Sequence, residues 1–153
     1  MGDKHRWNNW NEYKSAHDGC MRHYLSFFVV KDELAFNYAD EAIYVNGVLY
    51  CENGIEISVF KQLDVEKEKG RVMVRTVEYS YHIMRRIAGE VVNILRYDNI
   101  HLHKGHSDKH HKHIYNDAGE EISIIHVGYD NWLTLAEVME KAYQWNVQQT
   151  KSG

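Results

Sequence analysis

The middle of the chain alternates apolar and polar residues with the two-residue period of half-buried β-strands. The alternation is clear over residues 55–59 and over residues 72–84, where Tyr81 faces one side of the strand and His82 faces the other. A turn then leads into residues 91–97, which we expect to be the antiparallel partner of the strand before it. The pattern therefore predicts an antiparallel sheet with one buried face.

Turn signals divide these strands. Asn46-Gly47 separates two short apolar runs, and Asn53-Gly54 repeats the arrangement before the strand at 55–59. Because Asn-Gly between apolar runs is the strongest short signal for a β-hairpin, each dipeptide predicts a tight turn. Further turns are expected at residues 65–70, 88–89 and 116–119, and a further strand at residues 122–127.

The two ends of the chain carry the helical signals. Thr134 and Glu137 form a capping box, and apolar residues follow at helical spacing as far as Trp145. Near the N-terminus, residues 20–30 suit a helix or a strand that docks on the core. Strands followed by a helix predict an α+β fold, an antiparallel sheet with the C-terminal helix packed on one face. We expect residues 1–40 to be an N-terminal extension of helix or strand and residues 41–148 to be the main domain of one globular unit.

Composition supports a folded protein and restricts its partners. Of the 153 residues 44% are apolar and 26% are charged, which is typical of a globular domain. The formal net charge of −4 means that any anionic partner must be bound by a local patch. The sequence shows no signal peptide and no apolar run near the roughly 18 residues of a membrane span, so we expect a cytoplasmic protein without membrane contact. Cys20 and Cys51 are expected to be reduced thiols.

The densest chemistry lies in residues 101–113, which hold six histidines and three lysines. Three explanations compete for this predicted loop. The first is solvated surface, and the second is a metal site, because neutral imidazoles are common ligands of zinc, nickel and copper. The third is a phosphate site, where imidazoles transfer protons near neutral pH and lysines offset the negative charge of a transition state.

Neighbouring strands favour the phosphate site. Arg96, Tyr97 and Asp98 end one predicted strand directly before the loop, and His82 lies on the polar face of the strand expected to pair with it. Each residue alone also has a structural explanation, Asp98 as a turn residue and His82 as a hydrogen-bonded surface histidine. Together they place acid–base and phosphate-binding groups at one end of the sheet.

Three short motifs follow one another along the chain: Tyr79-Ser80-Tyr81-His82, Arg96-Tyr97-Asp98-Asn99 and His110-His111-Lys112-His113. In this order and near this spacing they resemble the TumE family, the toxins of bacterial and archaeal toxin–antitoxin modules. The resemblance covers roughly residues 48–145. It implies a toxin that is neutralised by a cognate antitoxin. The chain departs from the family in lacking proline before the histidine cluster and in its additional N-terminal region.

Resemblance and residue chemistry together lead to the hypothesis of a small, metal-independent ribonuclease toxin. The acid–base pair would be His82 with either His111 or His113. Arg96 and Lys112 would hold the phosphate, and Asp98 would orient a histidine. Residues expected to bind RNA are Tyr97, Lys104, Lys109 and His110.

Other readings of the same residues stay open. No cofactor is predicted, but if a divalent metal is used its ligands would be Asp98, His111 and His113. The alternative function is a non-catalytic metal-binding or nucleic-acid-binding module with histidine ligands. Aromatic residues of the N-terminal region would serve an antitoxin contact, a homodimer contact or a buried extension of the core: Trp7, Trp10, Phe27 and Phe28.

Overall fold

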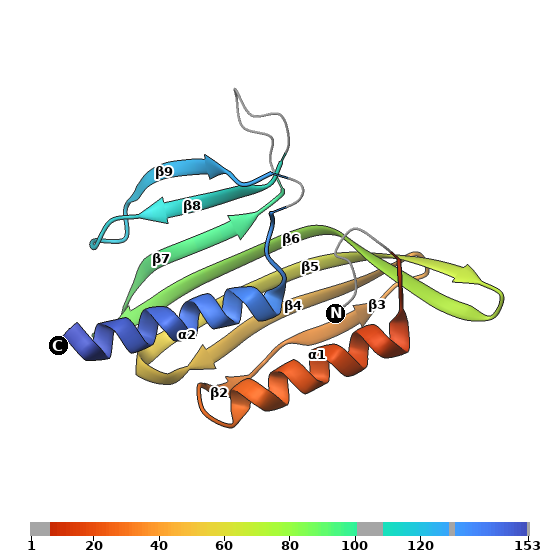
Figure 1. Cartoon of the computed structure of the whole chain (residues 1–153), viewed down its shortest axis with the longest axis horizontal. Helices are drawn as coiled ribbons and strands as arrows, with labels where there is room; N and C mark the ends of the chain where they lie inside the picture. The colour runs from red at the N-terminus through yellow and green to blue at the C-terminus, as the bar shows by residue number, and fades with distance from the viewer. Residues whose placement is uncertain (1–6, 101–108, 129–130, 153) are drawn as a thin grey trace.

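The computed structural model describes residues 7–100, 109–128 and 131–152, which form two α-helices and one nine-stranded sheet (Figure 1). The helices are α1 (Trp10–Leu25) and α2 (Leu135–Ser152). The strands are β1 (Asn8–Asn9), β2 (Val29–Asp32), β3 (Ala35–Tyr38), β4 (Ala42–Cys51), β5 (Ile55–Glu68), β6 (Arg71–Ile87), β7 (Glu90–Asp98), β8 (His111–Tyr115) and β9 (Glu121–His126).

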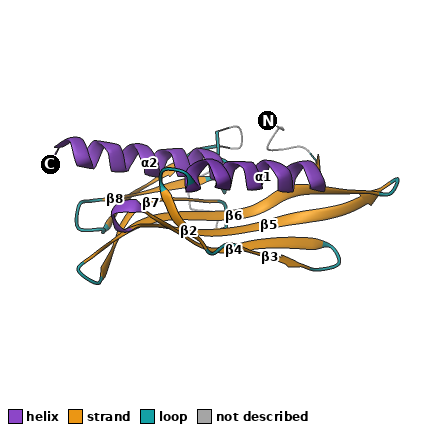
Figure 2. Cartoon of the chain, turned by 90° about the horizontal axis from the view of Figure 1, so that it is seen from below, coloured by secondary structure: helices purple, strands orange, loops and turns teal. Residues whose placement is uncertain are grey.

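The sheet is antiparallel throughout, in the order β2-β4-β5-β6-β7-β8-β9, with β3 also paired to β4 and β1 to β6. Both helices lie on the same side of the sheet (Figure 2). We call this side the helix face. The other side carries no helix in the described part of the chain, and we call it the open face.

Local capping explains where each helix begins. The Asn9 side chain accepts hydrogen bonds from the first backbone N–H groups of α1. For α2 the capping box forms as expected: the Thr134 N–H donates to Glu137 Oε1 at 3.0 Å, and the Glu137 N–H donates to Thr134 Oγ1 at 3.3 Å. The helices are joined by the Tyr24 hydroxyl, which donates to Glu140 Oε1 at 2.8 Å.

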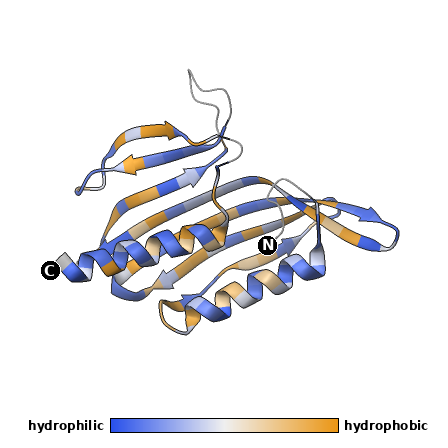
Figure 3. Cartoon of the chain, in the orientation of Figure 1, coloured by the Kyte–Doolittle hydropathy of each residue, from blue (hydrophilic) through white to orange (hydrophobic). Residues whose placement is uncertain are grey.

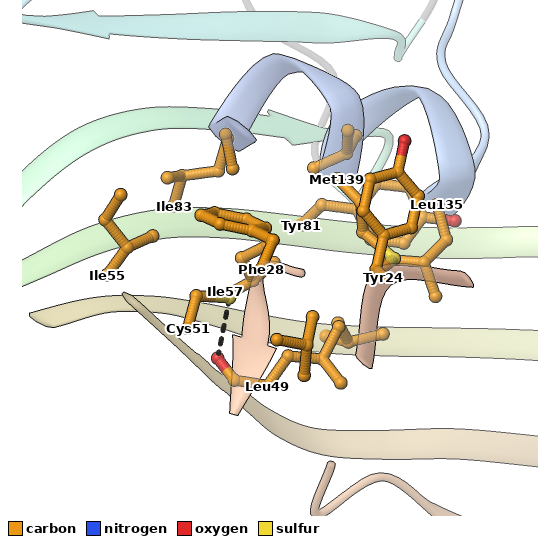
Figure 4. Packing of buried hydrophobic residues seen from close by; sticks show 14 of the residues in the cluster. Tyr24, Phe28, Leu49, Cys51, Ile55, Ile57, Tyr81, Ile83, Leu135 and Met139 are labelled. Atoms are coloured by element: carbon orange, nitrogen blue, oxygen red, sulfur yellow. Dashed lines mark hydrogen bonds between the residues drawn. The ribbon is translucent and has the colours of Figure 1, made fainter. Parts of the chain in front are cut away.

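The main core fills the space between the sheet and the helices. Along the strands hydrophobic residues alternate with hydrophilic ones (Figure 3), and the apolar set faces the helices. Leu49, Ile57 and Ile83 from three central strands meet Phe28 and Met139 (Figure 4). Full burial of such a side chain stabilises the fold by about 1.5–3 kcal/mol. This layer fixes which face of each strand points away from the helices.

These observations confirm the predicted α+β class and the C-terminal helix on one face. The predicted strands at 55–59, 72–84, 91–97 and 122–127 are present as parts of β5, β6, β7 and β9, and the Asn53-Gly54 turn is confirmed. In the N-terminal region both expected elements occur, since α1 is followed by β2. Phe28 is buried in the core, whereas Phe27 is 37% exposed. No helix among the described residues is long and apolar enough to cross a membrane.

The prediction of a hairpin at Asn46-Gly47 is wrong, because both residues lie inside β4. Gly47 has φ +141°, and a Cβ atom there would lie 2.2 Å from the carbonyl oxygen of Glu33. At this point the neighbour of β4 changes from β2 to β3. Glycine is therefore required for a close backbone approach and not for a turn.

Two other predicted loops contain strand. Residues 65–70 were expected to be a charged turn, but β5 continues to Glu68 and the turn is confined to Lys69 and Gly70. The predicted loop 101–113 ends in strand, because β8 begins at His111. Residues 101–108, with Lys104 and three of the histidines, lie outside the described residues.

Candidate active site

The register of β6, β7 and β8 places His82, Arg96 and His113 in one row across the sheet. His82 is the partner of Arg96, and Arg96 is the partner of His113. Partners in adjacent strands point to the same face, and their Cβ atoms lie about 4.5–5.5 Å apart. Because Tyr81, the neighbour of His82, is packed beneath the helices, the row lies on the open face.

Asp98 connects two members of this row. Its Oδ2 lies 2.8 Å from Arg96 Nε and 3.1 Å from His113 Nε2. The side chain is buried, with 2% exposed, and within the described chain its Oδ1 has no hydrogen-bond partner. A buried carboxylate is stable only when it is paired, so the two cation-forming side chains explain its place here. One carboxylate oxygen thus lies within ion-pair distance of both Arg96 and His113.

His113 contacts a second carboxylate through its other ring nitrogen. Nδ1 lies 2.6 Å from Oε1 of Glu121, a partly exposed residue at the start of β9. The two ring nitrogens thus each lie against a carboxylate oxygen, one from β7 and one from β9. Sequence reasoning missed Glu121. The turn at residues 116–119 was the available signal, because a hairpin there brings the start of β9 beside the end of β8.

His82 lies at the other end of the row in a less polar environment. Its ring is stacked on Tyr115 at a centroid distance of 5.9 Å. The pKa of His82 is lowered from its ordinary value, first by burial and then by the positive charge of Arg96. Nε2 is buried and, among the described residues, has no hydrogen-bond partner. His82 is therefore neutral near pH 7 and holds a nitrogen able to accept a proton.

His111 occupies the next row, opposite Asp98 on one side and His126 on the other. The His111 side chain is fully buried, and its Nδ1–H donates to the Lys109 carbonyl oxygen at 2.8 Å. The ring centroids of His111 and His126 are 6.0 Å apart. Sequence reasoning did not single out His126, although the same hairpin signal would have placed it beside His111.

Lys112 and Tyr97 face the helices and not the row of histidines. They are partners in the register, and Lys112 Nζ lies 5.8 Å from the centre of the Tyr97 ring. The pKa of Lys112 is lowered by burial and by the positive charge of Lys141 on α2. The expected clamp of Arg96 with Lys112 does not fit this register, because the two side chains lie on opposite faces.

His110 also lies on the helix side, in an aromatic stack. Its ring centroid is 5.4 Å from that of Trp132 and 5.7 Å from that of Tyr79. Its Nδ1 forms a hydrogen bond of 2.9 Å with the Tyr79 hydroxyl. Of the residues expected to bind RNA, Lys109 is exposed, whereas His110 and Tyr97 are buried. The structure therefore brings together His82, Arg96, Asp98 and His113, with His111 beside them opposite Asp98, and places Tyr97, His110 and Lys112 on the other face.

The conditional metal set of Asp98, His111 and His113 is not assembled as a ligand group. Within residues 7–100, 109–128 and 131–152 no three or more His, Cys, Asp or Glu side chains converge as they would around a metal ion. Asp98 and His113 are in contact, and Nδ1 of His111 is bound to the Lys109 carbonyl oxygen.

Fold and site define a small α+β protein with histidine, arginine and carboxylate side chains grouped on the open face of an antiparallel sheet. Comparison with known proteins identifies the family of the chain. The family model described as Toxin TumE matches residues 21–145, so the chain belongs to the TumE toxin family. No curated protein and no solved structure matches it. Membership of a toxin family implies an antitoxin partner. The matched region includes the whole row from His82 to His113.

Proposed function

We propose that this toxin acts by cleaving RNA, with His82 and His113 as the acid–base pair on either side of a phosphate bound by Arg96. The observation that carries the proposal is the row itself. Adjacent strands lie about 4.8 Å apart, so Arg96 is one strand away from each histidine. A phosphodiester held by its guanidinium would lie between two imidazoles.

Each step follows from the chemistry of these groups. Neutral His82 accepts the proton of an RNA 2′-hydroxyl, and the 2′-oxygen attacks phosphorus. The bond from phosphorus to the 5′-oxygen breaks, and His113 donates a proton to that oxygen. Arg96 stabilises the additional negative charge on the phosphate oxygens. The products are a 2′,3′-cyclic phosphate and a free 5′-hydroxyl.

The register favours His113 over His111 as the second histidine, because His113 shares the row of His82 and Arg96. His111 is fully buried and its Nδ1 is bound to a backbone carbonyl. His113 instead contacts Arg96's own partner, Asp98, which acts as a positioning residue for both. Access begins at Arg96, whose side chain is 34% exposed. Because Nε2 of His82 is screened from solvent, RNA binding must include a side-chain rearrangement beside it.

The test is cleavage of labelled RNA by the purified protein in the presence of a chelator, with analysis of the product ends. His82→Gln and Arg96→Met should each lower the rate by about 10²–10⁴-fold. His23→Gln, an exposed histidine on α1, is the matched control and should cleave normally. Products with 5′-phosphate ends, or full activity of both site variants, would refute the assignment.

A further inference from the structure

A cavity of about 450 Å³ lies on the helix face, on the opposite side of the sheet from the candidate active site. Its walls come from α1, the start of α2 and strands β5 and β6. Lining residues that matter here are Tyr13, His17, Lys61, Tyr81, Trp132 and Leu135. Figure 4 shows Tyr81 and Leu135 on this side of the sheet.

Lys61 brings a positive charge into this cavity. The side chain projects from β5 toward the helices and is 8% exposed, and its ammonium donates a hydrogen bond to the Tyr13 hydroxyl. In the described part of the chain no carboxylate lies within 4 Å of Nζ. Glu12 also lines the cavity but is exposed and forms no ion pair with Lys61. A buried ammonium without an opposite charge is unfavourable unless a counter-ion is supplied.

A second hydroxyl group in the cavity lies beside Lys61. Tyr81 is fully buried, and a side-chain hydrogen bond links its hydroxyl to the Lys61 ammonium. Neutral hydroxyl groups supply no opposite charge, so the Lys61 ammonium still lacks a counter-ion among the described residues. Tyr13, Tyr81 and Lys61 therefore present two hydroxyls and an ammonium to the same space.

The charge state of the cavity is fixed by its neighbours. Burial alone would lower the pKa of Lys61, but the hydroxyls of Tyr81 and Tyr13 outweigh it and hold the pKa above its ordinary value. The pKa of His17 is lowered to about 4, first by burial and next by the positive charge of Lys61. Near neutral pH the cavity thus contains a charged ammonium and a neutral imidazole.

The remaining wall is mainly apolar, with Met21, Leu135 and Trp132 among its residues. A mostly apolar cavity of about 300–1,000 Å³ with a few convergent polar groups is the usual form of a small-molecule site. We propose that this cavity binds a small organic anion, whose carboxylate or phosphate group contacts Lys61 and the hydroxyls of Tyr13 and Tyr81. Its apolar body packs on Leu135 and Trp132.

Part of this site lies in the N-terminal region that precedes the family match. Tyr13 and His17 come before residue 21, where the match begins. Without α1 the cavity would lack one wall and the hydrogen-bond partner of Lys61. The proposal thus gives the N-terminal region a role in ligand binding that does not depend on RNA cleavage.

Binding is tested by calorimetry and ligand-observed NMR with benzoate and with phenyl phosphate, and benzyl alcohol serves as the neutral analogue. We expect at least one anion to bind with Kd on the order of 1 mM or tighter, and the alcohol at least about tenfold more weakly. Comparison of the two anions identifies the preferred charged group. Absence of binding by both anions at about 10 mM, or equal binding of benzyl alcohol, would overturn the proposal.

Variants locate the site. Lys61→Met should weaken anion binding by about tenfold or more, whereas Lys67→Met, an exposed lysine on the same strand, should leave it unchanged. Ala136→Trp, at a half-buried position in the cavity lining, adds bulk to the cavity without altering Lys61 and should also weaken binding by about tenfold or more. This second variant tests the proposal even if Lys61→Met does not fold. Circular dichroism checks the fold of each variant. Anion binding of undiminished affinity in a folded Lys61→Met protein, or in a folded Ala136→Trp protein, would contradict the assignment.

Discussion

Replacing Asp98 by asparagine tests how the candidate active site is held together. The substitution keeps the size of the side chain but removes the charge whose Oδ2 contacts both Arg96 and His113. Loss of one partner from a buried ion pair costs about 3–5 kcal/mol. Because the Arg96 side chain is 34% exposed, water replaces part of the lost interaction, and we expect the free energy of unfolding to fall by about 2–3 kcal/mol. For a chain of this size that corresponds to a decrease in Tm of about 8 °C.

Urea denaturation followed by circular dichroism measures this effect, and the chain supplies a matched control. Asp64 forms an ion pair with Arg75 at 3.9 Å in which both side chains are about two-fifths exposed. Exposed pairs contribute about 0–1 kcal/mol, so Asp64→Asn should change stability very little. If Asp98→Asn is no more destabilising than Asp64→Asn, the carboxylate does not hold Arg96 and His113 in place.

Three further substitutions test other parts of the structure. Since His17 has a pKa of about 4 in the folded protein and 6.5 when unfolded, the unfolded chain binds the extra proton, and the free energy of unfolding should fall as the pH drops from 6.5 toward 4. His17→Gln should reduce this fall by about 2 kcal/mol, allowing for the partial exposure of the ring; an unchanged pH profile of urea midpoints would contradict it. Thr134→Ala removes the capping interaction with Glu137 and should lower the free energy of unfolding by about 1 kcal/mol in the same assay. An unchanged free energy of unfolding would show that the cap is not formed in solution. Gly47→Ala forces a Cβ atom against the Glu33 carbonyl at positive φ and should lower the free energy of unfolding by more than about 3 kcal/mol. An unchanged free energy of unfolding would exclude the close approach.

Elements with a local cause were predictable from the sequence. The alternation over residues 79–83 reflects helices on one face of β6 and none on the other, and the capping box at Thr134 involves residues only three positions apart. Residues 72–76 are out of phase with it, because a β-bulge lies opposite Gln62 and Leu63. The end of the β5–β6 hairpin gave no such signal. It projects beyond the rest of the sheet (Figure 1), and Glu66, Lys67 and Glu68 are exposed there. A strand that is solvated on both sides has no apolar face to produce a two-residue period.

Long-range contacts account for the wrong predictions. Asn46-Gly47 has the residues of a turn, but the required conformation comes from residues 33–34, which pass against the backbone of β4. In the same way, Lys112 was grouped with Arg96 because residues 101–113 were expected to be loop. Once His111–Tyr115 is a strand paired with β7, alternation sends Lys112 to one face and His113 to the other. The sequence identified the types of residue in the site, and only the register could select among them.

The same alternation separates the two sites proposed here. Tyr81 and His82 are consecutive on β6, yet Tyr81 enters the cavity beneath the helices and His82 belongs to the row on the open face. A ligand that contacts the Tyr81 hydroxyl and a phosphate that contacts Arg96 would therefore lie on opposite sides of one layer of backbone. The two proposals therefore depend on different residues on different faces of the sheet. Loss of the Lys61 ammonium removes a charge from the helix face only, and loss of the Arg96 guanidinium removes one from the open face only, so each can fail without the other.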